Sequence, residues 1–204
     1  MKSFCGNNQL MTRHGGFSLV ELLVTIAILV ILSAVAVPGF QGMMASSSLR
    51  AATNDVVAAL AQTRSLAIKE GGRVTMCKSA NGTACATTGD WEQGWIIFVD
   101  SVRNSPWTNA SVDTGETVSF YTQALQGNVV VRGNSGASQY VSYSADGLSR
   151  QLNGSSLAAA TIRVCSTSSA IADNQRARDI AINSTGRVTV TTAASVTSAC
   201  AAPS

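Results

Sequence analysis

The stretch Gly15-Gly16-Phe17-Ser18-Leu19-Val20-Glu21 decides the fold, because it opens a long apolar run that ends at Val37. Glu21 is the single charged residue of this run, and no charged residue occurs from Leu22 to Leu49. The run is long enough to cross a bilayer as a helix, which takes about 20 residues. The sequence therefore predicts a membrane-spanning helix that carries one acidic side chain near its start.

Two basic residues, Lys2 and Arg13, precede the apolar run. By the positive-inside rule they keep the N-terminus in the cytoplasm and send the rest of the chain across the membrane. Composition alone leaves two explanations open. One is a secretory signal peptide with Ala34-Val35-Ala36 as a small-residue cleavage site. The other is a simple membrane anchor.

Glu21 distinguishes between these explanations. An acidic side chain within the first turns of a bilayer-length helix costs roughly 2.5–3.5 kcal/mol on insertion scales, so it calls for a partner. A signal peptide has no use for such a partner. Glu21 therefore favours a helix that is retained in the mature protein.

The sequence from Gly15 to Glu21 resembles the prepilin peptidase site of type IV pilins. In that family the leader is cut after a glycine, the new N-terminal phenylalanine is N-methylated, and a glutamate follows four residues later. The resemblance implies a leader of residues 1–16, cleavage between Gly16 and Phe17, and methylation of Phe17. It also implies that Glu21 is the carboxylate that acts in assembly.

Elementary chemistry supports the role of Glu21. In an apolar filament core, a carboxylate near a neighbouring subunit's free α-amino group gains a charge-assisted hydrogen bond. This bond forms only when the subunits stack in the correct register. A carboxylate that is unfavourable in lipid therefore favours assembly in the one register that pairs it.

The helix is expected to extend well past the apolar run. A helix from Phe17 to Glu70 would span roughly 80 Å at 1.5 Å per residue, and Gly71-Gly72 would end it. Pro38 is expected to kink the helix, or alternatively to end it at the membrane surface. We assign 17–40 to the membrane or filament core and 41–70 to an amphipathic continuation. The stripe expected to pack on a domain is Leu49, Thr53, Val56, Leu60 and Ala67.

Beyond Gly72 the pattern changes to short strands separated by Gly, Asn and Ser turns. One long helix followed by strands alone predicts an α+β fold, in which an antiparallel sheet lays its apolar face on the helix. The end of the chain, 191–204, is expected to be loose apart from Cys200. The expected strands are 73–77, 94–100, 117–121, 128–132, 139–143, 161–165, 179–183 and 187–191.

Five cysteines are present, and Cys5 lies in the predicted leader. Four cysteines in an exported domain indicate two disulfides, for which the sequence alone permits three pairings. We expect Cys77 to pair with Cys85 across a short turn, and Cys165 to pair with Cys200 so that the C-terminus is held to a core strand. The spacings match no zinc site, and no metal or cofactor is expected.

The domain at 71–204 carries a second resemblance, to the GspH/FimT family of minor pilins and minor pseudopilins. It implies the pilin-like fold and a domain in the periplasm. Trp91 and Trp95 are interpreted as two residues on one strand face that pack on the helix. Asp100 and Asp146 are interpreted as turn residues. The resemblance rests on Val74–Cys77, Cys85, Asp90-Trp91, Gly94-Trp95, Phe98–Asp100, Asp146-Gly147, Ile162–Cys165 and Asn183–Arg187.

Three functions are compatible with these resemblances. The first is a minor type IV pilin that helps to initiate a pilus, and the second is a pseudopilin of type II secretion. The third is DNA uptake, because some FimT-like pilins resemble DNA receptors with a basic Gly-Arg-x-Arg segment. Here Gly186-Arg187-Val188-Thr189 lacks the second arginine, so a patch would need Arg176, Arg178, Arg187 and the nearby Arg163.

Composition weakens the case for nucleic acid and for an enzyme. Without Lys2 and Arg13 the 14 basic residues fall to 12 against 11 acidic ones, a charge of about +1, so phosphate binding would require local clustering. The single histidine, His14, also lies in the leader, and no nucleophile–base pair or phosphate loop is visible. We therefore predict no catalytic residues. The expected partners are other pilins or pseudopilins, the prepilin peptidase and the inner membrane, and nucleic acid is not favoured.

The processing site gives the first testable prediction. Intact-mass analysis of the membrane-extracted protein should show the loss of residues 1–16 and the gain of one methyl group. The reason is that Glu21 lies four residues after Phe17 and is followed by an unbroken apolar run. A mature N-terminus at Val37 would instead identify a secreted protein and contradict the pilin interpretation.

Overall fold

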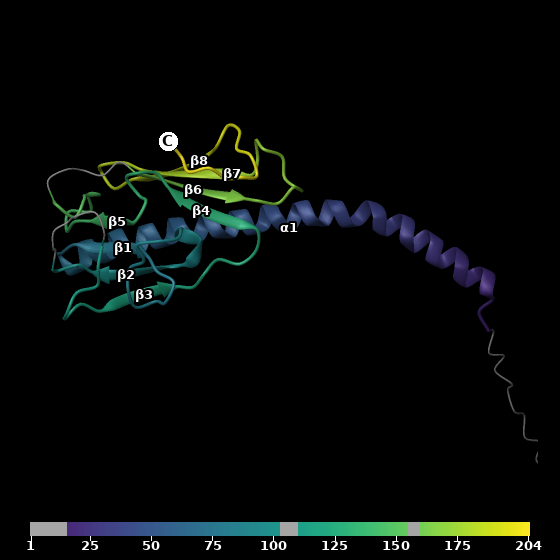
Figure 1. The fold of residues 1–204 in the computed structure, drawn as a ribbon, viewed down its shortest axis with the longest axis horizontal. Coiled ribbons are helices and arrows are strands. Elements are labelled where there is room, and N and C mark those ends of the chain that lie inside the picture. Colours follow the sequence, from purple (N-terminus) through teal and green to yellow (C-terminus); the bar gives the residue numbers. More distant parts are fainter. Residues whose placement is uncertain (1–15, 103–109, 155–159) are drawn as a thin grey trace, which may run out of the picture. The chain divides into compact units, whose positions relative to one another are not determined.

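The computed structural model describes residues 16–102, 110–154 and 160–204 (Figure 1). The chain forms two compact units, Met1–Gly39 and Phe40–Ser204. The predicted leader, except for Gly16, lies outside the described residues. The elements are one long helix, α1 (Leu19–Glu70), a short 3₁₀ helix, η1 (Trp91–Gln93), and eight strands. The strands are β1 (Val74–Lys78), β2 (Trp95–Val99), β3 (Val118–Thr122), β4 (Val129–Gly133), β5 (Tyr140–Tyr143), β6 (Ala160–Ser166), β7 (Ala177–Ile182) and β8 (Val188–Thr192).

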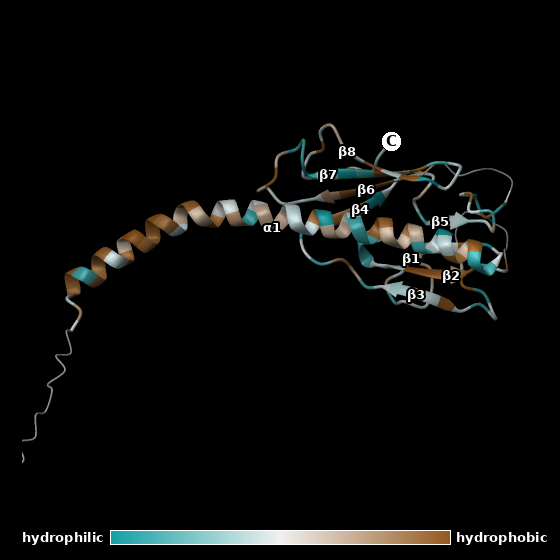
Figure 2. Ribbon diagram, turned by 180° about the vertical axis from the view of Figure 1, so that it is seen from behind, coloured by the Kyte–Doolittle hydropathy of each residue, from teal (hydrophilic) through white to brown (hydrophobic). Residues whose placement is uncertain are grey.

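The described part of the first unit is the start of α1 and the three residues before it. In the described residues α1 is the one helix that is long and apolar enough to cross a membrane. Figure 2 shows that hydrophobic residues predominate in this part of the helix. Its large apolar side chains are exposed. The helix runs unbroken past position 38, so the expectation of a helix end there is wrong. A proline removes one backbone hydrogen bond, and here the turns on both sides continue the helix.

In the second unit the strands form two antiparallel four-stranded sheets, ordered β3-β2-β1-β5 and β4-β6-β7-β8 (Figure 1). Each of the eight expected strands is present within about two residues of its predicted bounds. The expectation of a single sheet is wrong. Strand β4 pairs with β6 and not with β3, so the chain crosses to a second sheet between Thr122 and Val129.

Both sheets pack on the same half of α1. The predicted stripe from Leu49 to Ala67 is confirmed, because all five of its residues are buried, Leu49 being 2% exposed. The four apolar residues of the stripe share one core with Met76 and Ile97 of the first sheet and with Ile162 and others of the second. Successive residues point to opposite faces of a strand, and the residues between these core positions, such as Cys77 and Cys165, lie in smaller clusters away from the helix.

The helix ends as the paired glycines predict. Gly71 has φ 62°, a left-handed conformation that an L-residue adopts at a cost. The amide of Gly72 donates to the carbonyl of Ala67 at 3.3 Å. A bond of this span is the one that closes a helix with a glycine just past its end.

The segment from Trp91 to Trp95 connects the two sheets. Trp95 begins β2, but Trp91 lies in η1, so the expectation that both sit on one strand is wrong. Gly94, with φ 107° and ψ 175°, separates the two elements, and only glycine adopts this conformation readily. Both indoles are nevertheless buried in the core with the helix, as expected.

Hydrogen bonds from η1 reach β4, an edge strand of the second sheet, and the loop that follows it. Trp91 Nε1 donates to the carbonyl of Ala137 at 2.8 Å. Glu92 Oε2 accepts from the amide of Val131 on β4 at 3.0 Å. Next to them, Arg132 of β4 forms an ion pair with Asp90 at 2.6 Å. The bonds of Glu92 and Asp90 hold β4 beside η1, and the bond of Trp91 holds the loop after β4.

The end of the chain is packed, so the expectation that 191–204 is loose is wrong. Ala193, Val196 and Cys200 are buried in a cluster with Cys165 and Ala177. The amide of Val196 also donates to the carbonyl of Asp173 at 3.0 Å. A tail rich in Ser, Ala and Thr is thus ordered by a few small apolar side chains and a disulfide.

Gly94 provides a stability test. A Cβ on Gly94 would lie 2.4 Å from the carbonyl oxygen of Thr122, in addition to the backbone strain. Gly94→Ala should lower the free energy of unfolding by about 3 kcal/mol or more. Urea unfolding followed by fluorescence of the buried tryptophans measures the loss.

Gly115→Ala is the matched control. Gly115 also has a positive φ, 93°, but a Cβ there would meet no atom within 4 Å. We expect only the backbone cost, about 1–2 kcal/mol. Equal losses for the two variants would contradict the assignment of Gly94 as a steric contact between η1 and β3.

Candidate processing and assembly site

The candidate processing site lies at the start of α1. Gly16, Phe17 and Ser18 precede the helix, and Phe17 is 74% exposed. Ser18 caps the helix: its Oγ accepts from the amide of Glu21 at 3.3 Å, and its carbonyl accepts from the amide of Leu22 at 3.1 Å. The bond between Gly16 and Phe17 therefore lies in exposed, non-helical chain.

Glu21 occupies the first turn of α1 and is exposed. In the described residues no hydrogen bond or ion pair reaches its carboxylate, although its amide is bonded to Ser18. The partial positive charge at a helix N-terminus favours an acidic residue here. The site thus presents a carboxylate, in an otherwise apolar segment, that is available to a group from outside the described chain.

Sequence reasoning missed the role of Ser18. The signal was present, because Ser18-Leu19-Val20-Glu21 fits the Ser-x-x-Glu pattern of a helix N-terminus. The structure contains the serine half of this pattern, the bond from the glutamate amide to the serine hydroxyl. This hydrogen bond gives a structural reason for the position at which the helix begins.

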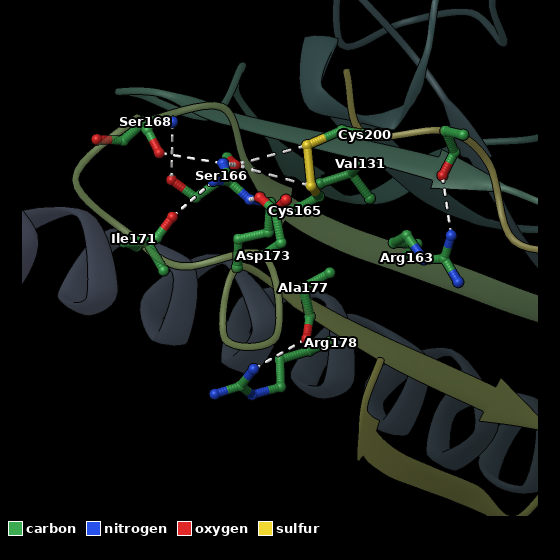
Figure 3. Close-up of a disulfide and its surroundings, with 12 residues drawn as sticks. Val131, Arg163, Cys165, Ser166, Ser168, Ile171, Asp173, Ala177, Arg178 and Cys200 are labelled. Atoms are coloured by element: carbon green, nitrogen blue, oxygen red, sulfur yellow. Dashed lines mark hydrogen bonds and ion pairs between the residues drawn. A yellow bond between two sulfur atoms is a disulfide. The ribbon is translucent and has the colours of Figure 1, made fainter. Parts of the chain in front are cut away.

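The structure contains both expected disulfides. Cys77, near the end of β1, is joined to Cys85, with their Cα atoms 5.5 Å apart. Cys165 of β6 is joined to Cys200, with Cα atoms 5.8 Å apart (Figure 3). In the described residues no group of acidic, histidine or cysteine side chains could hold a metal ion.

Arg176 has a structural role, because its guanidinium is nearly buried and bonded within the protein. Its side chain is 6% exposed and forms an ion pair with Asp173 at 2.8 Å. The same guanidinium donates to the carbonyls of Ser166, Ser168 and Ile171 at 3.1, 3.1 and 2.6 Å. Ser166 ends β6, and Ser168 and Ile171 belong to the loop between β6 and β7, which lies beside the disulfide (Figure 3). Arg176 therefore braces this loop against the end of β6.

The other arginines of the expected basic patch do not gather. Arg163 forms two hydrogen bonds to Asp179, at 2.7 and 2.8 Å, which raise the pKa of Arg163 above its ordinary value. Arg178 donates to backbone carbonyls next to it. Arg187 is exposed in the turn between β7 and β8, at the far end of the hairpin from Arg178.

Two glycine turns that carry the family resemblance pack on each other. A Cβ on Gly186 would lie 2.2 Å from the carbonyl oxygen of Gly147. Arg64 of α1 donates to the carbonyl of Thr185 beside them at 3.2 Å. Tyr143 is buried next to Gly186, and burial raises the pKa of its hydroxyl to about 12. These residues fasten the end of the helix to both sheets.

The two aspartates singled out in the sequence have structural roles. Asp146 is a turn residue as expected, since it accepts from Ser144 Oγ and from the amide of Leu148. These bonds, the one from Ser144 foremost, hold the pKa of Asp146 below its usual value. Asp100 directly follows β2, is buried, and accepts from Thr75 Oγ1 at 2.7 Å. It therefore ties the end of β2 to β1.

A surface hollow of about 610 Å³ lies in the second unit beside α1. Phe40 and Met44, both more than half exposed, line it on the helix side. The loops at 127–128 and 167–169 form the other wall and contribute Asn, Ser and Thr side chains. No charged side chain is among the lining residues, so the hollow presents apolar and neutral polar groups.

Comparison with solved structures identifies the fold of this chain. The type IV minor pilin FimU of Pseudomonas aeruginosa aligns with a TM-score of 0.51 and 15% sequence identity, over 71% of this chain and 89% of FimU. A second crystal form of FimU aligns with a TM-score of 0.45 and 15% identity, over 73% and 91%. The alignment with a TM-score of 0.51 shows that the fold of this chain is the α+β pilin fold.

Family models identify the family to which the chain belongs. Residues 52–195 match the family described as type II transport protein GspH, and residues 11–37 match the prokaryotic N-terminal methylation motif. The chain belongs to the GspH family. A search of curated protein sequences finds no match.

The brace formed by Arg176 generates a prediction. Arg176→Ala would leave three carbonyls without their donor, and each unsatisfied buried group costs about 1–3 kcal/mol. We expect the free energy of unfolding to fall by about 3 kcal/mol, measured by urea titration. Arg178→Ala is the control, because its side chain bonds only to backbone carbonyls near in sequence and should cost less than about 1 kcal/mol. Similar losses for both would contradict the bracing role.

Proposed function

We propose that this chain is a minor type IV pilin of the FimT/FimU kind. Prepilin peptidase cuts the precursor between Gly16 and Phe17, and Phe17 is then N-methylated. Segment 17–40 holds the protein in the inner membrane as a single pass, and 41–70 continues the helix. The domain at 71–204 lies in the periplasm until the protein enters a pilus, whose assembly it helps to initiate.

The observation that carries this proposal is the carboxylate of Glu21. It lies four residues after the proposed new N-terminus, in an apolar helix, and without a partner among the described residues. An unpaired charge in the hydrocarbon region is unfavourable, and a neighbour's α-amino group would relieve it. The match of residues 11–37 to the N-terminal methylation motif supports the same reading of this segment.

The second unit suits a filament subunit. Its hollow beside Phe40 and Met44 is lined by apolar and neutral polar groups. This uncharged surface could accommodate a neighbouring subunit. The helix–sheet core is complete within the chain. The role proposed for the domain is therefore contact with other pilins, and for α1 attachment to the membrane or filament core.

Two alternatives belong to the same fold. A minor pseudopilin of a type II secretion system would have the same processing, and the description of the matching family favours it. The genes on either side, pilin or secretion components, distinguish the two. DNA uptake is less favoured, because Arg176 is engaged within its loop and Arg178 and Arg187 lie at opposite ends of a hairpin.

The proposal predicts the behaviour of Glu21→Ala. The domain should fold normally. Membrane insertion should become easier, because a charged side chain no longer has to enter the hydrocarbon region. Incorporation into filaments should fall clearly, since the neighbour's α-amino group loses its partner. The measurement is the amount of the variant in sheared filament fractions relative to its amount in the membrane.

Thr25→Ala is the control for a polar change in the same segment. The hydroxyl of Thr25 bonds to the carbonyl of Leu22 within the helix, so its loss should leave incorporation near that of the wild type. If Glu21→Ala is incorporated as well as Thr25→Ala, Glu21 is not an assembly contact and the proposed mechanism is wrong.

A further inference from the structure

The position at which α1 begins is set by one side chain. Ser18 is the last non-helical residue, and its hydroxyl satisfies the amide of Glu21, one of the amides of the first turn that have no partner inside the helix. Serine is among the best residues for this position and alanine among the worst. The bond therefore fixes the first helical residue as Leu19.

The proposed scissile bond lies just upstream of this cap. A backbone that is exposed and free of regular hydrogen bonds is the preferred site of proteolysis, whereas a helical one must first unfold. Gly16 and Phe17 are exposed and lie outside the helix. A Cβ at Gly16 would meet no atom within 4 Å, so packing in the described chain does not hold this segment, and the cap separates it from the helix.

The cap matters because, without it, the nearest residue that can cap the helix is Gly16, next to the scissile bond. Alanine at position 18 would remove the hydroxyl and also favour helix. Phenylalanine is not a capping residue, whereas glycine is an acceptable one. The helix would then tend to begin after Gly16, which would place Phe17 in its first turn and the scissile bond at the cap.

We propose that Ser18 is a positioning residue for the processing of this chain. By capping α1 it keeps the bond between Gly16 and Phe17 outside the helix, in a form that a peptidase can bind extended. The inference rests on the proposed cleavage after Gly16. It assigns to Ser18 a role that the cleavage motif itself does not state, through backbone geometry and not through contact with the enzyme.

The test compares the full-length precursor with Ser18→Ala and Ser18→Asn in membranes incubated with peptidase-bearing inner-membrane vesicles. Intact mass gives the fraction cut over time. Asparagine caps a helix as well as serine does but is larger and has no hydroxyl. We expect Ser18→Asn to be cut within about twofold of the wild-type rate and Ser18→Ala about fivefold more slowly, the factor that corresponds to a typical N-cap.

Amide hydrogen exchange gives an independent readout of the cap. In the detergent-solubilised precursor, the amide of Glu21 should exchange faster in Ser18→Ala than in wild type, and Ser18→Asn should restore its protection. A change in cleavage without this change in exchange would show that Ser18 acts by another route and would overturn the proposal.

Other outcomes separate this inference from the function on which it rests. A peptidase that reads a small side chain at position 18 would cut Ser18→Ala like wild type and Ser18→Asn slowly, and this order overturns the positioning role. Equal rates for all three proteins overturn it as well. A wild-type precursor that is not cut after Gly16 overturns the proposed processing and this inference together.

Discussion

The burial of one face of α1 between two sheets is the interaction on which the rest of the second unit depends. Residues spaced three or four apart from Leu49 to Ala67 contact strands of both sheets in a single core. Each square ångström of apolar surface removed from water contributes about 25 cal/mol. Because the sheets pair separately, they are joined into one domain by the helix, by the segment from Trp91 to Trp95 and by the packed turns at Gly147 and Gly186.

The sequence predicted most of the elements because their signals are local. Short runs of β-branched and apolar residues between Gly, Asn and Ser turns located all eight strands, and Gly71-Gly72 located the end of the helix. The short separation of Cys77 and Cys85 suggested their pairing. Each of these signals comes from residues that lie close together in the chain, and a single sequence shows such residues directly.

The errors concern long-range packing. No local signal says that β4 pairs with β6 and not with β3, so two sheets were taken for one. The spacing of Trp91 and Trp95 fits a strand as well as a 3₁₀ turn followed by a strand. The charge of Arg176 suggested a binding surface, whereas carbonyls of a loop close in the fold bury it. At the candidate site, the cleavage position and Glu21 came from a recognisable pattern, and the capping role of Ser18 needed the hydrogen bond.

The two disulfides lie on the sheet faces that point away from the helix. Cys77 belongs to a cluster with Ile96 and Phe98, and Cys165 to one with Ala177 and Val196, and neither cluster contains a residue of α1. Reduction would therefore take no contact from the helix–sheet core and would loosen only the outer layers. The two disulfides therefore cross-link the outer faces of the sheets, and the core cluster that joins the helix to the sheets contains no cysteine.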